Sequence, residues 1–173
     1  VALMERGVDV EAKNKSNWTP LHHAANGGHT EVAVALMEKR ADVDAKDRYN
    51  AAPLHYAAEY AADSGFTEVA VALIERGAHL DATNDIEGTP LHRAAHRDQT
   101  EVAVALIERG ADVGAKDRYG RTPLDKAGPA VRAVLRAAAA GMARLWTVHR
   151  HREFGPAAHR CVVTVLLCNG RRD

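Results

Sequence analysis

Apolar residues recur along most of the chain in short stripes separated by polar, turn-forming stretches. Leu21, Ala24 and Ala25 form one stripe, and Val32, Ala35 and Leu36 form the next. Spacings of three and four residues place side chains on one face of a helix. The pattern therefore predicts pairs of short amphipathic helices joined by tight turns. The longest apolar runs are far too short to cross a bilayer, so no membrane span is expected.

The stripes belong to a unit that repeats. "TPLHHAANGGHTEVAVAL" at residues 19–36 and "TPLHRAAHRDQTEVAVAL" at residues 89–106 agree at 13 of 18 positions. The four-residue motif returns as APLH at 52–55 and TPLD at 122–125, so that its fourth positions lie 33, 37 and 33 residues apart. A helix pair this small cannot bury its apolar face alone, and such a period predicts helix pairs stacked on one another.

The residues between the stripes supply helix ends. Thr19 is predicted to cap the first helix, with Pro20 at its first position, and Gly28 to end that helix in a left-handed conformation. Thr30 is predicted to cap the second helix. The polar run at residues 40–47 suits a hairpin that leads to the next repeat.

On these motifs the chain resembles the ankyrin repeat family over residues 1–141. The resemblance implies an all-α solenoid of stacked helix-turn-helix units with connecting β-hairpin loops. Its expected divisions are a partial repeat at 1–14, repeats at 15–47, 48–84 and 85–117, and a degenerate C-terminal cap at 118–141. Residues 142–173 have no repeat phase and form a basic tail. That tail is expected to be poorly ordered or to pair as a hairpin.

The chain departs from the repeat pattern at three places that predict local differences. Ala52 replaces the motif threonine, so His55 is expected to lose its usual partner. Arg40 stands where the other repeats have Gly7, Gly77 and Gly110, which predicts an arginine in the left-handed region. Residues 60–63 are extra, and we expect them to extend a first helix by about one turn. Tyr56 and Tyr60 would then lie on one face of that helix and point together.

No catalytic, metal or cofactor site is predicted. His22, His55 and His92 recur at the repeat period without a partner at ligand spacing, and the resemblance implies that each bonds the motif threonine and ties repeats together. His159, Cys161 and Cys168 lack a fourth zinc ligand. We therefore expect no enzyme and no cofactor. The two cysteines make no disulfide framework, which favours an intracellular protein, cytoplasmic or nuclear.

The resemblance places recognition on a concave surface formed by hairpin tips and first helices, and the aromatic residues gather there. Tyr, Trp and Arg dominate interface hot spots. We therefore predict a non-catalytic module that binds another protein and is itself a monomer. The alternative is a targeting segment of a larger enzyme, channel or effector. The predicted contact residues are Trp18, His23, Arg48, Tyr49, Tyr56, Tyr60, Arg93, His96, Arg97, Arg118, Tyr119 and Arg121.

Acidic and basic residues balance at 23 each, so we do not expect nucleic acid to be the main partner. The six arginines of residues 142–173 keep a contact with nucleic acid open as a weaker alternative.

Overall fold

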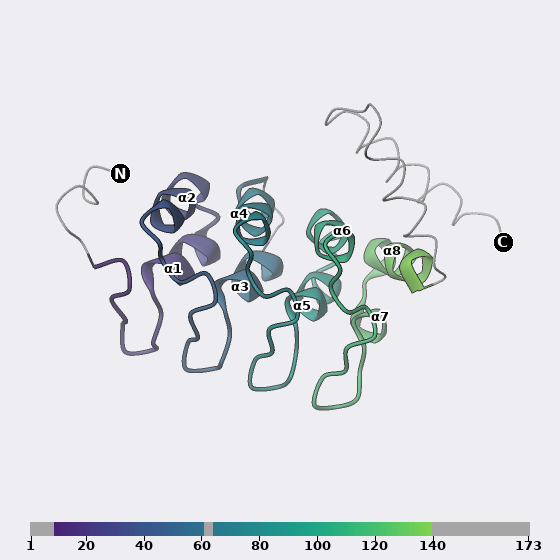
Figure 1. The fold of residues 1–173 in the computed structure, drawn as a ribbon. Coiled ribbons are helices and arrows are strands. Elements are labelled where there is room, and N and C mark those ends of the chain that lie inside the picture. The colour runs from purple at the N-terminus through teal and green to yellow at the C-terminus, as the bar shows by residue number, and fades with distance from the viewer. Residues whose placement is uncertain (1–8, 61–63, 140–173) are drawn as a thin grey trace, which may run out of the picture.

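The computed structural model describes residues 9–60 and 64–139, and in this part of the chain it places eight helices in two rows (Figure 1). The first helices of the repeats form the inner row, and the second helices form the outer row. Four loops project from the same side of the array. The inner row is α1 (Pro20–Gly27), α3 (Pro53–Glu59), α5 (Pro90–His96) and α7 (Pro123–Lys126). The outer row is α2 (Thr30–Glu38), α4 (Ser64–Glu75), α6 (Thr100–Glu108) and α8 (Pro129–Ala139).

The all-α prediction is confirmed. Neither described stretch contains a β-strand, and the loops reverse direction through turns closed by side chains. Leucines occupy the centre of the core, where the inner and outer helices of neighbouring repeats meet, and each of them is at most 2% exposed. These leucines are Leu21, Leu36, Leu54, Leu73, Leu91, Leu106 and Leu135.

The predicted left-handed residues are confirmed. Gly28 follows α1 with φ 65°, and Arg40 follows α2 with φ 64°, the conformation that Gly77 and Gly110 adopt in the other repeats. An L-residue in this region brings its Cβ close to the following carbonyl oxygen. Arg40 is therefore a strained substitute for glycine.

The prediction that Thr30 caps α2 is wrong. His29 occupies the N-cap position, and Thr30 is the first residue of the helix. The Thr30 hydroxyl points to the next repeat instead, where it donates to the carbonyl oxygen of Gly65 at 3.1 Å and to Oε2 of Glu68 at 3.1 Å. The hydroxyl therefore joins two outer helices rather than closing its own.

The prediction for the extra residues is also wrong. Helix α3 ends at Glu59, and Tyr60 lies beyond it with φ −113°, while residues 61–63 fall outside the described part of the chain. Helix α4 has 12 residues, against nine in α2 and nine in α6. The lengthening therefore lies at the start of the second helix. There Phe66 lies so close to Gly28 that a Cβ on that glycine would be 3.0 Å from its ring. The packing of α4 on the preceding repeat explains where the helix begins.

Candidate protein-binding surface

Each projecting loop ends in a five-residue tip with the same architecture. We call these tip 1 (residues 14–18), tip 2 (47–51), tip 3 (84–88) and tip 4 (117–121). In tip 2, Oδ1 of Asp47 accepts from the amides of Tyr49 at 2.8 Å and Ala51 at 2.9 Å. Asn14, Asn84 and Asp117 close their own tips in the same way. One side chain therefore fixes each turn, as Asx residues do in loops.

Hydrogen bonds between main-chain atoms join neighbouring tips. The amide of Arg48 donates to the carbonyl oxygen of Ser16 at 3.1 Å, and the amide of Asp85 donates to that of Tyr49 at 2.9 Å. The amide of Arg118 donates to the carbonyl oxygen of Ile86 at 2.9 Å. The four tips consequently form one continuous edge, which we call the tip ridge.

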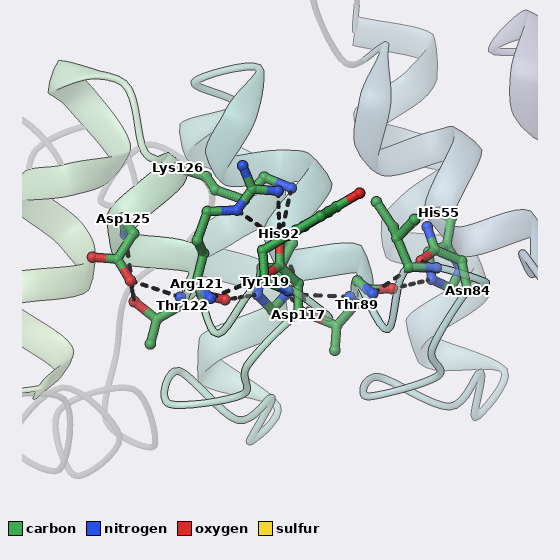
Figure 2. Close-up of polar contacts among 12 residues, drawn as sticks. His55, Asn84, Thr89, His92, Asp117, Tyr119, Arg121, Thr122, Asp125 and Lys126 are labelled. Carbon is green, nitrogen blue, oxygen red and sulfur yellow. Dashed lines mark hydrogen bonds and ion pairs between the residues drawn. The ribbon is translucent and has the colours of Figure 1, made fainter.

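The motif histidines tie each inner helix to the next tip. In His55, Nδ1 accepts from the amide of Ala52 at 3.1 Å, and Nε2 lies 3.1 Å from the carbonyl oxygen of Gly88. His22 and His92 make the same contact to Ala51 and Arg121, at 3.1 and 2.9 Å (Figure 2 shows His55 and His92). The threonine contact implied by the resemblance is present at His22 and His92.

The expectation that His55 loses its usual partner is only half right. The hydroxyl contact is missing at Ala52, but the amide of residue 52 still donates to the ring. Since Nδ1 accepts a hydrogen bond from this amide, it carries no proton of its own, so His55 is neutral and carries its proton on Nε2. Burial lowers the pKa of His55 to about 4 and also lowers the pKa of His22 and His92.

Trp18 and Tyr56 come together at Asp47 in tip 2, and His23 packs on the Trp18 ring. The Trp18 indole donates to Oδ2 of Asp47 at 3.1 Å, and the Tyr56 hydroxyl donates to the same oxygen at 2.6 Å. The centroid of the Trp18 ring lies 4.7 Å from that of Tyr56 and 5.0 Å from that of His23.

The charge on Asp47 is stabilised by its donors. Burial opposes ionisation of Asp47, but the bonds from Tyr56, Ala51, Tyr49 and Trp18 outweigh it and lower the pKa of the carboxyl group. Because Tyr56 is partly buried and donates to this carboxylate, its own pKa is raised. Four donors on one carboxylate hold the neighbouring rings in fixed positions.

Tyr60, Arg93 and Arg97 form a second group around Glu59. Both arginines pair with Glu59, Arg97 at 3.0 Å between Nη2 and Oε1. The Arg97 guanidinium also lies 5.9 Å from the centroid of the Tyr60 ring, which faces Phe66 at 6.1 Å. The prediction that Tyr56 and Tyr60 point together is therefore wrong, because Tyr60 lies past the end of α3 and joins a different group.

A third group lies at tip 4 around Asp117 (Figure 2). Oδ2 of Asp117 accepts from Nε of Arg121 at 3.0 Å and from its Nη2 at 2.9 Å, while Nζ of Lys126 lies 3.6 Å away. Burial opposes this charge, but the bonds from Arg121 and Tyr119 outweigh it and hold the pKa of Asp117 well below its usual range. The Arg121 guanidinium also lies 4.6 Å from the centroid of the Tyr119 ring.

Tip 2 carries an exposed arginine and tyrosine. Tyr49 is 53% exposed, and the Arg48 guanidinium lies 5.0 Å from the centroid of its ring. At tip 4, the Arg118 guanidinium donates to the carbonyl oxygen of Asp85. His96 is exposed at the end of α5. All twelve predicted residues thus lie on tips, on inner helices or directly beside them.

Sequence reasoning missed the acidic residues that organise these groups. Asp47 and Asp117 stand at the same place in their repeats, the first position of a tip, and this shared position was the available signal. Lys126 stands where other repeats have His23, Tyr56 and Arg93, directly after the fourth motif residue. No periodic signal marks Glu59 as the partner of two arginines from the next repeat.

No site for a metal ion is formed by groups of three or more His, Cys, Asp or Glu side chains in residues 9–60 and 64–139. His159, Cys161 and Cys168 lie outside the described residues. None of the described helices combines the length and the apolar character that crossing a membrane requires.

Comparison with protein-family models gives two overlapping matches. A model described as ankyrin repeats (3 copies) matches residues 1–84, and a second, ankyrin repeats (many copies), matches residues 59–127. No curated protein matches the chain.

Proposed function

Because this chain belongs to the ankyrin repeat family, we propose that it is a non-catalytic module that binds another protein through its tip ridge and inner helices. Ankyrin repeats generally mediate protein–protein interactions, and ankyrin repeat domains are typically not catalytic. The proposal keeps the repeat boundaries at residues 15–47, 48–84 and 85–117, flanked by partial units. It also takes the module to be a monomer that works inside the cell.

One observation carries the proposal: large amphipathic side chains are exposed on the tip ridge, while the framework of each repeat is buried. Tyr49 and Tyr119 are 53% and 64% exposed, whereas the motif histidines are at most 1% exposed. Each of the two tyrosines has a guanidinium over its ring. Exposed aromatic and arginine side chains held in place in this way suit interface hot spots, because less entropy is lost when a partner binds.

The groups around Asp47, Glu59 and Asp117 support the same surface. Their carboxylates hold Trp18, Tyr56, Arg93, Arg97 and Arg121 through internal hydrogen bonds and ion pairs. A partner would meet side chains that are already ordered, and little rearrangement would be needed on binding.

Affinity capture from an extract of the source cells tests the proposal. The bait proteins are the wild type, the double variant Tyr49→Ala/Tyr119→Ala, and the control Arg136→Ala on α8 in the outer row. The proposal expects a protein that the wild type and the control capture and the double variant does not. Calorimetry with that protein should then show weakening of about 1–3 kcal/mol for each tyrosine, as hot-spot truncation does.

The opposite pattern, in which the tip variant binds fully and the outer-row variant does not, would place recognition elsewhere. Analytical ultracentrifugation of the free protein tests the oligomeric state, and the proposal expects the mass of a monomer.

A further inference from the structure

The four tips share one backbone but differ in charge along the ridge, and tip 3 is the acidic one between two tips whose second residue is an arginine. Tips 2 and 4 begin with the same three residues, Asp-Arg-Tyr, whereas tip 3 reads Asn-Asp-Ile-Glu-Gly. The second position is Lys15 in tip 1, Arg48 in tip 2, Asp85 in tip 3 and Arg118 in tip 4, so that tips 2 to 4 read basic, acidic, basic. Because a side chain at the first position closes every tip in the same way, the second residues of tips 2 to 4 leave the ridge from equivalent places.

Most cations of the concave surface already have a carboxylate. Glu59 pairs with Arg93 and Arg97, and Asp117 pairs with Arg121 and Lys126. The guanidinium groups of Arg48 and Arg118 instead contact neutral groups. Arg48 lies 3.4 Å from Oγ of Ser16, and Arg118 donates to the carbonyl oxygen of Asp85. Among the described residues, no ion pair joins either of these two arginines to a carboxylate.

A tyrosine follows each of these arginines in the sequence, and a guanidinium lies over each ring, that of Arg48 over Tyr49 and that of Arg121 over Tyr119. Both rings are more than half exposed. Between them, Asp85 and Glu87 of tip 3 are exposed acids. The ridge thus offers two places that suit a carboxylate next to an apolar group, and a central place that repels a carboxylate and suits a cation.

From this arrangement, and resting on the proposed function, we infer that the tip ridge binds an extended peptide segment with two acidic clusters flanking a basic residue. Helices pack about 8–10 Å apart, so equivalent points two repeats apart are separated by about 20 Å. An extended chain rises about 3.3 Å per residue, which puts the centres of the two acidic clusters about six residues apart.

Synthetic peptides of one composition test the charge pattern. The matched peptide carries two Glu-Glu pairs centred about six residues apart around a central Lys. The shuffled peptide places the four Glu together in the centre and the Lys at one end. Fluorescence anisotropy of labelled peptides should show the matched peptide binding at least about tenfold more tightly at low salt, and that preference should shrink as added salt screens the charges.

Protein variants locate the binding on the ridge. Arg48→Glu and Arg118→Glu should each weaken binding of the matched peptide by about tenfold or more, while the matched control Arg136→Glu on α8 should leave it unchanged. Asp85→Lys should reduce the difference in affinity between the two peptides, because the acid that repels the central Glu residues of the shuffled peptide is removed. Circular dichroism of each variant checks that the helices are intact.

Equal affinity for the two peptides, no binding of either, or an equal loss with Arg136→Glu would overturn the inference. Its failure can be told apart from failure of the proposed function by use of the captured protein. Capture that is lost with Tyr49→Ala/Tyr119→Ala but insensitive to Arg48→Glu and to salt would keep the binding surface and reject the charge pattern. Capture that no concave substitution affects would reject the surface itself.

Discussion

The Nε2 atom of His55 lies 3.1 Å from the carbonyl oxygen of Gly88, so one buried ring joins the inner helix of one repeat to the tip of the next. The opposite ring nitrogen accepts from the amide of Ala52 at 3.1 Å. A second proton on the ring would remove that acceptor, because both nitrogens of a charged histidine are donors. The joint between repeats therefore requires a neutral histidine.

Stability is expected to fall as the pH drops from about 6.5 towards 4. The pKa of His55 is about 4 in the folded protein, and those of His22 and His92 are also lowered, whereas an unfolded histidine has a pKa of about 6.5. In this window the unfolded chain binds protons that the folded chain does not. The stabilisation is fully present above pH 6.5, and His55 alone accounts for about 3 kcal/mol of loss by pH 4.

Urea unfolding across this range measures the loss. A variant with His55→Gln should be less stable at pH 7 and should show a flatter dependence on pH. A constant unfolding free energy between pH 7 and pH 4.5 would contradict the neutral-histidine joint. Asp47 and Asp117 have lowered pKa values, so their protonation changes the unfolding free energy mainly below the pH range of this test.

Arg40→Gly is expected to stabilise the array by about 1 kcal/mol. The residue has φ 64°, a conformation that costs an L-residue about 1–2 kcal/mol, and the greater freedom of glycine in the unfolded chain offsets part of the gain. The urea midpoint should rise with an unchanged slope.

Gly77→Ala is the matched reverse change. Gly77 has φ 86°, and a Cβ there would meet no atom within 4 Å, so any loss of stability would reflect backbone strain alone. If Arg40→Gly lowered the midpoint, backbone strain at Arg40 would be refuted.

Tyr56→Phe should destabilise the protein by about 1–3 kcal/mol, because it removes a hydrogen bond to a charged, buried acceptor. The hydroxyl donates to Oδ2 of Asp47 at 2.6 Å. Tyr49→Phe, on an exposed ring, is the control and should change stability little. Equal thermal midpoints for the two variants would show that the Asp47 group does not stabilise the fold.

Trp18→Ala should lower both stability and affinity for the partner. Tyr119→Ala should lower affinity with little effect on stability. The Trp18 indole donates to Asp47 and its ring packs on Tyr56, whereas the Tyr119 ring is 64% exposed. We expect a loss of about 3 kcal/mol for Trp18→Ala, within the range for buried aromatic truncations, and less than about 1 kcal/mol for Tyr119→Ala. Denaturant unfolding of both variants checks the difference, and similar losses would mean that Trp18 is not part of the fold's support.

Gly28→Ala should be strongly destabilising for two coupled reasons. Gly28 has φ 65°, and a Cβ there would lie 3.0 Å from the Phe66 ring. Phe66→Ala removes the close contact but not the backbone strain. In a double-mutant cycle the two losses should therefore be less than additive. Additive losses would indicate that α4 does not pack on this turn.

The repeat pattern predicted the helices, and the family resemblance implied the histidine joints, but neither predicted the other side-chain contacts between repeats. Pro20 and Gly28 act through their own backbone conformation, so their roles follow from local chemistry. Thr19 occupies the N-cap position of α1, and its hydroxyl contacts Nδ1 of His22 at 2.9 Å. The Thr30 hydroxyl could either cap its own helix or bond to the next repeat. It bonds to the next repeat because α4 lies close to it. The extra residues could likewise lengthen either helix, and the packing of Phe66 on Gly28 selects the second.

The candidate surface shows the same limit. Composition and resemblance placed the aromatic and arginine residues on the tips and inner helices, where the structure also has them. The three groups depend on which carboxylate each side chain reaches, and most of these contacts cross from one repeat to the next. Asp47 binds Tyr56 from the following repeat, and Glu59 binds Arg93 and Arg97 from the following repeat.

The acceptor of every motif histidine is a main-chain carbonyl, and the residues that provide it are Ala51, Gly88 and Arg121. The histidine joint therefore does not depend on the side chain at the last position of the tip. The tip-to-tip hydrogen bonds do not depend on side chains either, because they join main-chain atoms. Substitutions at exposed tip positions such as Tyr49 and Tyr119 can therefore change the surface while the main-chain coupling between units is preserved. In evolutionary terms, specificity can change at these exposed positions without a change in how the repeats assemble.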